Sequence, residues 1–72
     1  MGVKGEYMYE YNISGSYLST DAKGICTRKY FNEDVKAKDN VEAMKKVVGN
    51  FAWNESDEGN TFLLERIHYE CL

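Results

Sequence analysis

The chain of 72 residues has the size of one small domain, spanning residues 1–72, and carries a formal net charge of −3 and two cysteines. The charge is uneven, because residues 1–32 hold four basic and three acidic side chains, whereas residues 33–72 hold five and nine. A general nucleic-acid binder carries a basic excess or stripe. The observed balance argues against that class and fits a basic protein partner or simply a soluble small domain.

The hydrophobic pattern predicts a cytoplasmic protein. The first residues lack the apolar segment of a signal peptide, and no run reaches the roughly 18–20 apolar residues of a membrane helix. Thiols stay reduced in the cytoplasm. We therefore expect no membrane contact, and we expect Cys26 and Cys71 to be core thiols, with pairing on oxidation as the alternative.

The first predicted element is a strand over about residues 6–18, with a bulge at Gly15. Tyr7, Tyr9 and Tyr11 occupy alternate positions and Ile13 continues the row, so all four share one face of the strand. This tyrosine row has two interpretations. It either lies under a helix as core, or it is partly open and contacts a partner through large amphipathic rings.

Residues 19–24, with sequence STDAKG, are rich in turn formers, and a second extended run follows over residues 25–38. The two runs and the short turn predict an antiparallel hairpin. Lys29 and Glu33 break the apolar alternation of the second run. We therefore expect that strand to bulge or to end near Asn32.

A helix is predicted to begin after Asp39, which has a capping residue's chemistry, with Glu42 three positions later. Apolar residues at helical spacing follow, and Gly49 is the expected stop. The predicted helix is about ten residues long. A helix so short is marginal alone, so it must be held by packing on the sheet.

Residues 53–60, with sequence WNESDEGN, are predicted to form a solvated acidic loop, and residues 61–72 a central or well-covered last strand. In that strand we expect one face to hold Leu63, Ile67, Tyr69 and Cys71, and the other to hold Phe62 and Leu64. The fold class is α+β, with strand order β-β-α-β and one short helix on an antiparallel sheet of three strands. A fourth short strand over residues 51–54 is an alternative.

No catalytic set can be assembled from this sequence, so we expect a protein that is not an enzyme and needs no cofactor. Cys26, His68 and Cys71 make three zinc ligands where a structural site uses four, and positions 68 and 71 of a strand face opposite sides. The acidic segment lacks the twelve-residue calcium-loop pattern. We expect no metal site.

The segment VKAKDNVEAMKKV, residues 35–47, combines an extended run, an aspartate cap and a short amphipathic helix. With a hairpin before it and a strand after it, the chain resembles small strand-strand-helix-strand proteins of phages and mobile elements. Some of these, including certain anti-CRISPR proteins, are non-catalytic inhibitors that bind a host defence complex. The resemblance covers architecture and size, and it implies a protein-binding role without assigning any site residue.

Three hypotheses about function follow. The first is a non-catalytic protein-binding module, an inhibitor or accessory factor, whose expected contact residues are Tyr7, Tyr9, Tyr11, Glu55, Asp57 and Glu58. The second is a nucleic-acid-associated regulator that stacks bases on the sheet, with Lys4, Lys23, Arg28 and Lys29 as the basic cluster. The third, compatible with both, is a homodimer formed through a strand edge or the tyrosine row.

Overall fold

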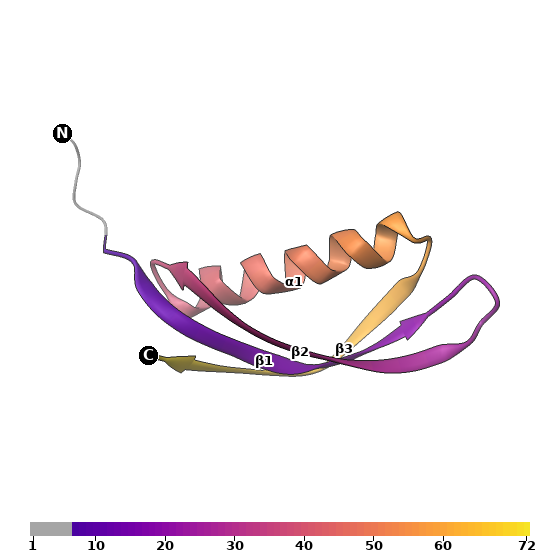
Figure 1. Cartoon of the computed structure of the whole chain (residues 1–72), viewed down its shortest axis with the longest axis horizontal. Coiled ribbons are helices and arrows are strands. Elements are labelled where there is room, and N and C mark those ends of the chain that lie inside the picture. The colour runs from indigo at the N-terminus through magenta and orange to yellow at the C-terminus, as the bar shows by residue number, and fades with distance from the viewer. Residues whose placement is uncertain (1–6) are drawn as a thin grey trace.

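The computed structural model describes residues 7–72, which form three strands and one helix (Figure 1). The elements in chain order are β1 (Tyr9–Thr20), β2 (Cys26–Ala37), α1 (Asn40–Asp57) and β3 (Thr61–Cys71). The antiparallel sheet has the order β2-β1-β3, and α1 lies on one face. The predicted α+β class and the β-β-α-β order are confirmed. We call the face under α1 the helix face and the other the open face.

The position of β3 differs from the prediction. Among the described residues it pairs only with β1. It is thus an edge strand and most of its residues are exposed, although its apolar content predicted a central or well-covered strand. The hairpin leaves one side of β1 free, and β3 takes that side after α1. Within the described residues, no helix combines the length and the apolar character that crossing a membrane requires.

The β1–β2 hairpin pairs without interruption from Tyr9 opposite Ala37 to Thr20 opposite Cys26. The predicted break near Asn32 is therefore wrong. Lys29 fits the alternation because it lies on the helix face, where its ammonium group donates a hydrogen bond to a carboxylate of α1. The apolar alternation of a strand does not predict which face a charged side chain takes when that side chain contacts a buried charged group.

A β-bulge at Glu65 divides β3 into two halves. Arg66 pairs with Ser16 and Leu64 with Tyr17, so Glu65 has no partner on β1 and the alternation of side chains shifts by one residue. Leu64 consequently shares the helix face with Ile67. The prediction that Leu63 and Ile67 share a face is wrong, because the extra residue moves every β3 side chain before the bulge to the opposite face.

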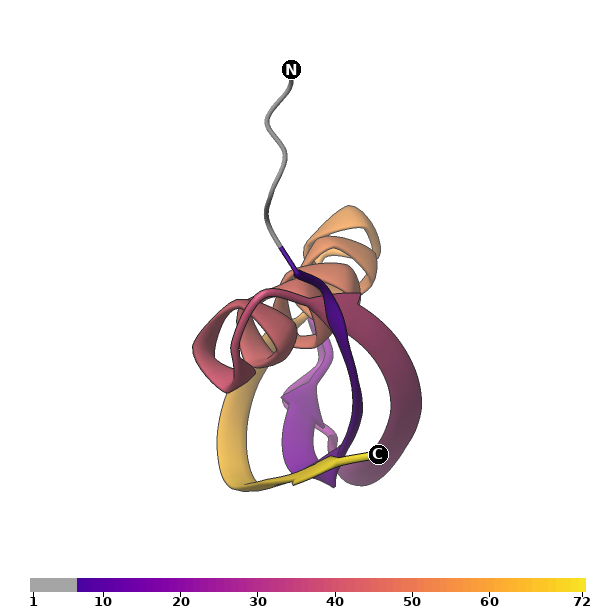
Figure 2. The same ribbon diagram turned by 90° about the vertical axis from the view of Figure 1, so that its left-hand side faces the viewer.

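Gly15 lies beside this bulge and is sterically required there. A β-carbon at this position would collide with the carbonyl oxygen of Arg66 and lie 2.7 Å from Cζ of Phe31. The sequence predicted a bulge in β1 at Gly15. The structure instead has the bulge in β3, next to Gly15. The sheet is bowed, with α1 on its concave side (Figures 1 and 2).

The helix begins as predicted and ends later. Asp39 accepts a hydrogen bond from the backbone N–H of Glu42 (2.8 Å), and the Glu42 side chain accepts one from the N–H of Lys38 (2.9 Å). The helix then continues through Gly49 to Asp57, because an interior glycine costs only about 1 kcal/mol relative to alanine and the residues beyond it are packed. The predictions of a ten-residue helix and of an alternative strand over residues 51–54 are wrong. The predicted loop over residues 53–60 is wrong for residues 53–57, which belong to α1.

The longer helix packs on the sheet with one stripe, Ala43, Val47 and Phe51, each of them buried. The ring of Phe51 stacks on that of Tyr17, with centroids 4.2 Å apart and planes inclined by 6°. Aromatic pairs of this kind contribute roughly 0.5–1.5 kcal/mol beyond the area they bury. The buried core consists of Tyr11, Ile13, Tyr17, Ala37, Ala43, Val47 and Phe51.

Candidate protein-binding surface

The tyrosine row is divided between core and surface. Tyr11 and Ile13 are buried under α1, whereas Tyr9 is 49% exposed and Tyr7 79% exposed. The core interpretation therefore holds for Tyr11 and Ile13, Tyr7 and Tyr9 are open, and contact of these rings with a partner stays a prediction. The division follows from the chain path, because Tyr9 begins the strand and Tyr7 precedes it, beyond the part of the sheet that α1 covers.

The acidic segment does not act as one unit. Asp57 and Glu58 are exposed, but Glu55 lies in the last turns of α1 and is only 3% exposed. Its carboxylate accepts hydrogen bonds from Tyr17 Oη (3.1 Å), Lys29 Nζ (2.9 Å), Asn60 Nδ2 (3.2 Å) and the hydroxyl of Ser19. In this structure Glu55 is not available to contact a partner, contrary to the prediction of a solvated loop.

The environment of Glu55 keeps it charged. The hydrogen bond from Ser19 and then that from Lys29 are the main causes that lower its pKa from 4.5 to about 2, against the opposing effect of burial. Burial, and then the hydrogen bond that it donates to Glu55, raise the pKa of Tyr17. This cluster fastens the end of α1 to β1 and β2. Sequence analysis missed it because its members are far apart in the chain, and the one signal was Lys29 breaking the alternation of its strand.

The proposed basic cluster is not gathered on one surface. Arg28 faces the open side and pairs with Glu65 (2.8 Å), whereas its neighbour Lys29 faces the helix side and pairs with Glu55. Lys23 lies in the hairpin turn, and Lys4 lies outside the described residues. The arrangement gives the nucleic-acid hypothesis no continuous basic stripe within residues 7–72.

The two cysteines are exposed, so the prediction of core thiols is wrong. Cys26 pairs with Thr20 and Cys71 with Tyr11, nine residues apart on β1 and hence roughly 30 Å apart along the strand. His68 and Cys71 face opposite sides, as predicted. Among residues 7–72, no group of three or more His, Cys, Asp or Glu side chains could hold a metal ion.

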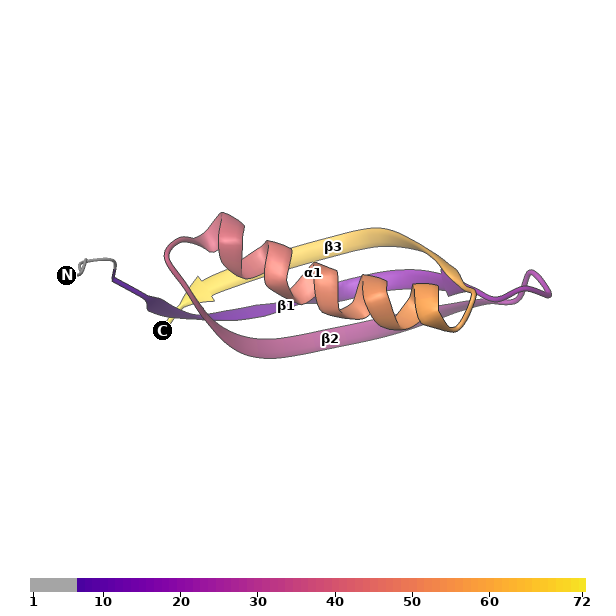
Figure 3. The same ribbon diagram turned by 90° about the horizontal axis from the view of Figure 1, so that it is seen from above.

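An apolar groove of about 450 Å³ runs between α1 and β3. Its lining is Val41, Met44, Lys45, Val48 and Gly49 from the helix and Leu64 and Ile67 from the strand. Val41 is 51% exposed. Figure 3 shows that α1 crosses the sheet obliquely: its first half lies over and beyond β3, and its second half lies towards β2.

Among residues 7–72 no strand pairs with the outer edge of β3, and this free edge borders the groove. The N–H of Leu72 donates to the carbonyl of Glu10 (2.9 Å), and hydrogen-bonded pairs alternate along antiparallel strands. The backbone groups of Ile67, Tyr69 and Cys71 therefore point away from β1, towards solvent. We call the groove and this edge, residues 66–72, the groove-edge surface.

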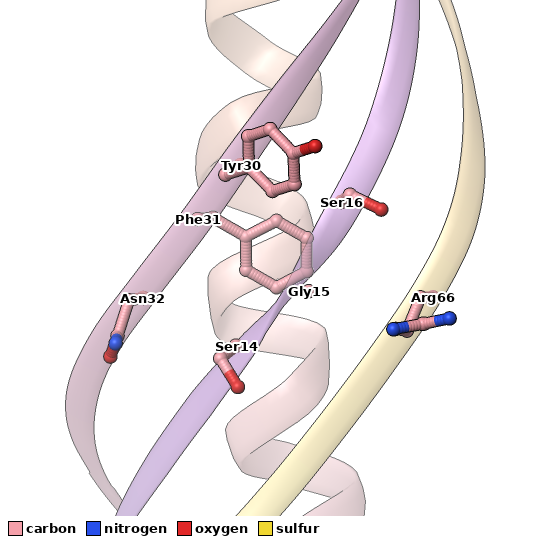
Figure 4. Close-up of a pocket in the computed structure, with 7 residues that line it drawn as sticks. All are labelled: Ser14, Gly15, Ser16, Tyr30, Phe31, Asn32 and Arg66. Atoms are coloured by element: carbon pink, nitrogen blue, oxygen red, sulfur yellow. The ribbon is translucent and has the colours of Figure 1, made fainter.

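A second hollow, of about 430 Å³, lies on the sheet at Gly15 and is lined by polar side chains and by the rings of Tyr30 and Phe31 (Figure 4). Ser14 and Ser16 line it from β1, and Asn32 and Tyr30 from β2. The guanidinium of Arg66 lies across from them on β3. The ion pairs of the described residues are Arg28 with Glu65 and Lys29 with Glu55, so Arg66 has no carboxylate partner within residues 7–72.

No family model, curated protein or solved structure matches this chain. The resemblance to small phage proteins therefore stays a prediction based on architecture. What the structure itself shows among residues 7–72 is an apolar groove beside the outer edge of β3.

Proposed function

We propose that this chain is a non-catalytic protein-binding module and that its partner docks on the groove-edge surface. The observation that carries the proposal is the apolar groove beside an unpaired strand edge. Exposed apolar side chains that lie together on a small protein are typical of interaction sites. Backbone groups of a free strand edge add affinity that does not depend on the partner's side chains.

The two edges of the sheet are not equivalent. β2 carries five charged side chains in twelve residues, an arrangement that protects edges against unwanted pairing. β3 carries three in eleven, and two of these lie at the bulge. We therefore propose that the part of β3 beyond the bulge is the edge that a partner uses.

The role that we propose for this module is that of an inhibitor or accessory factor of a host protein complex in the cytoplasm. This role is proposed because the chain resembles small phage proteins in architecture and because the second half of the chain is acidic. Exposed Tyr7, Tyr9, Asp57 and Glu58 are proposed as supplementary contacts. The aromatic rings offer large rigid contact areas, and the carboxylates would speed association with a basic partner.

The test is affinity capture from cell lysate with matched variants, with and without nuclease, read by mass spectrometry. Val41→Glu places a charge in the groove and suits the first turn of a helix, so the fold should persist. Leu63→Glu is the control: Leu63 is 65% exposed and lies on the open face opposite Leu18.

We expect the wild type and L63E to retain one stoichiometric protein partner after nuclease treatment and V41E to lose it. Equal capture by V41E and L63E would refute the groove-edge surface as the docking site. Capture that disappears with nuclease would instead indicate nucleic-acid association, and its salt dependence would then be measured.

A further inference from the structure

We propose that the groove-edge surface takes one extended strand of a partner protein, added antiparallel to β3, with the five-residue pattern basic-apolar-any-apolar-acidic. This inference rests on the proposed function, because it specifies the partner of the same surface. The outward-pointing backbone groups of Ile67, Tyr69 and Cys71 set which partner residues form hydrogen bonds. Antiparallel addition matches the rest of the sheet.

The apolar positions of the pattern follow from the helix face. Cross-strand neighbours in a sheet point to the same side, so partner residues opposite Ile67 and Tyr69 point towards α1. There they meet the groove side chains of Val41, Met44 and Leu64. Apolar side chains at these two positions would cover a groove that is nearly free of polar atoms.

The charged positions follow from the open face. Arg66 and Glu70 pair with Ser16 and Asn12 of β1, and therefore both lie on that face. They are four residues apart on one strand, roughly 13 Å, so they do not neutralise each other. An added antiparallel strand places an acidic residue opposite Arg66 and a basic one opposite Glu70, with three residues between them.

A strand fits this surface better than a second copy of the whole chain. The first half of α1 lies over and beyond β3 in Figures 2 and 3. In a dimer with its two-fold axis at the β3 edge, the α1 helices of the two copies would occupy the same space above the joined sheet. A single strand, by contrast, passes beneath the overhanging helix, where its apolar side chains enter the groove.

The chain itself contains the required pattern, which provides a probe. Residues 66–70 read Arg-Ile-His-Tyr-Glu, that is basic, apolar, any, apolar and acidic. A labelled nine-residue peptide copied from residues 64–72, with Cys71→Ser, is titrated into the full-length protein. The control peptide has the same composition with its arginine and its second glutamate, the copies of Arg66 and Glu70, exchanged.

The protein is tested as wild type and as the double variant Arg66→Glu/Glu70→Arg. We expect the wild type to bind the first peptide roughly tenfold or more tightly than the exchanged one, because two cross-strand charge pairs change sign. The double variant should show the reverse preference. Amide exchange should slow at Ile67, Tyr69 and Cys71 when peptide binds, since only their N–H groups gain new partners.

Failure of this inference and failure of the proposed function are distinguishable. No peptide binding at millimolar concentration, or equal binding of both peptides by both proteins, would overturn the strand-addition proposal. Loss of captured partner in V41E would still support the groove as a docking site. A dimer in sedimentation equilibrium that R66E dissociates would assign the edge to a second copy and overturn the choice of partner.

Discussion

Replacing Glu55 with glutamine removes the charge from the buried cluster that joins α1 to the sheet and keeps the size of the side chain. The pKa of Glu55 lies at about 2 instead of 4.5. This difference corresponds to about 3 kcal/mol as an upper bound. The Lys29 side chain is 40% exposed, so solvent screens part of its interaction with Glu55. We expect E55Q to lose about 2 kcal/mol at pH 7.

The pH dependence of this loss has a defined sign. A carboxyl group whose pKa is lowered by folding stabilises the protein fully above its unfolded value, near 4.5, and this stabilisation disappears as the pH falls through about 2. The wild type should therefore approach E55Q in stability between pH 4.5 and pH 2. At pH 7 the variant should unfold roughly 8–16 °C lower, at about 4–8 °C for each kcal/mol in a domain of this size.

The assay is thermal unfolding followed by circular dichroism at several pH values between 7 and 2. Asp57→Asn is the matched control, because Asp57 is exposed and lies at the end of the same helix. It should be neutral or slightly stabilising, since a negative charge at a helix C-terminus is unfavourable. An E55Q protein as stable as the wild type at pH 7, or a difference that does not change with pH, would refute the reasoning.

Two further predictions concern the glycines and the thiols. Gly15→Ala should destabilise the protein by about 1–3 kcal/mol, because its β-carbon collides with backbone. Gly49→Ala should stabilise it by about 0.5–1 kcal/mol, since nothing lies within 4 Å of that site on α1. Denaturant unfolding that gave both variants the same free energy of unfolding would contradict both expectations. Cys26 and Cys71 should both react with a thiol reagent in the folded protein, and oxidation should yield crosslinks between chains; an intramolecular disulfide would contradict the pairing of the strands.

Sequence reasoning was reliable where the determinant was local. The cap at Asp39 and the turn between the first two strands could be read from a few neighbouring residues. The helix end could not, because the residues that carry α1 past Gly49 do so through contacts with Tyr17 and other residues on the sheet. Local propensity is overridden when tertiary packing contributes more than the cost of one glycine.

The candidate site was harder to predict than the fold. The bulge at Glu65 leaves no mark in the sequence of β3, yet it decides that Leu64 lines the groove and that Leu63 does not. The tyrosine row is a regular pattern within one predicted strand, so it can be recognised in the sequence. The groove depends instead on the oblique crossing of α1 over β3, a relation between elements that hydrophobic periodicity does not contain.

The most direct test of the account places a photo-crosslinking residue, p-benzoyl-phenylalanine, at position 41 in the groove or at position 63 on the open face. Both positions are well exposed and chemically similar, so they differ chiefly in the face that they report. Covalent adducts to a partner protein from position 41 and none from position 63 would support protein binding through the groove-edge surface. Adducts from position 63 alone, or from neither position, would contradict it.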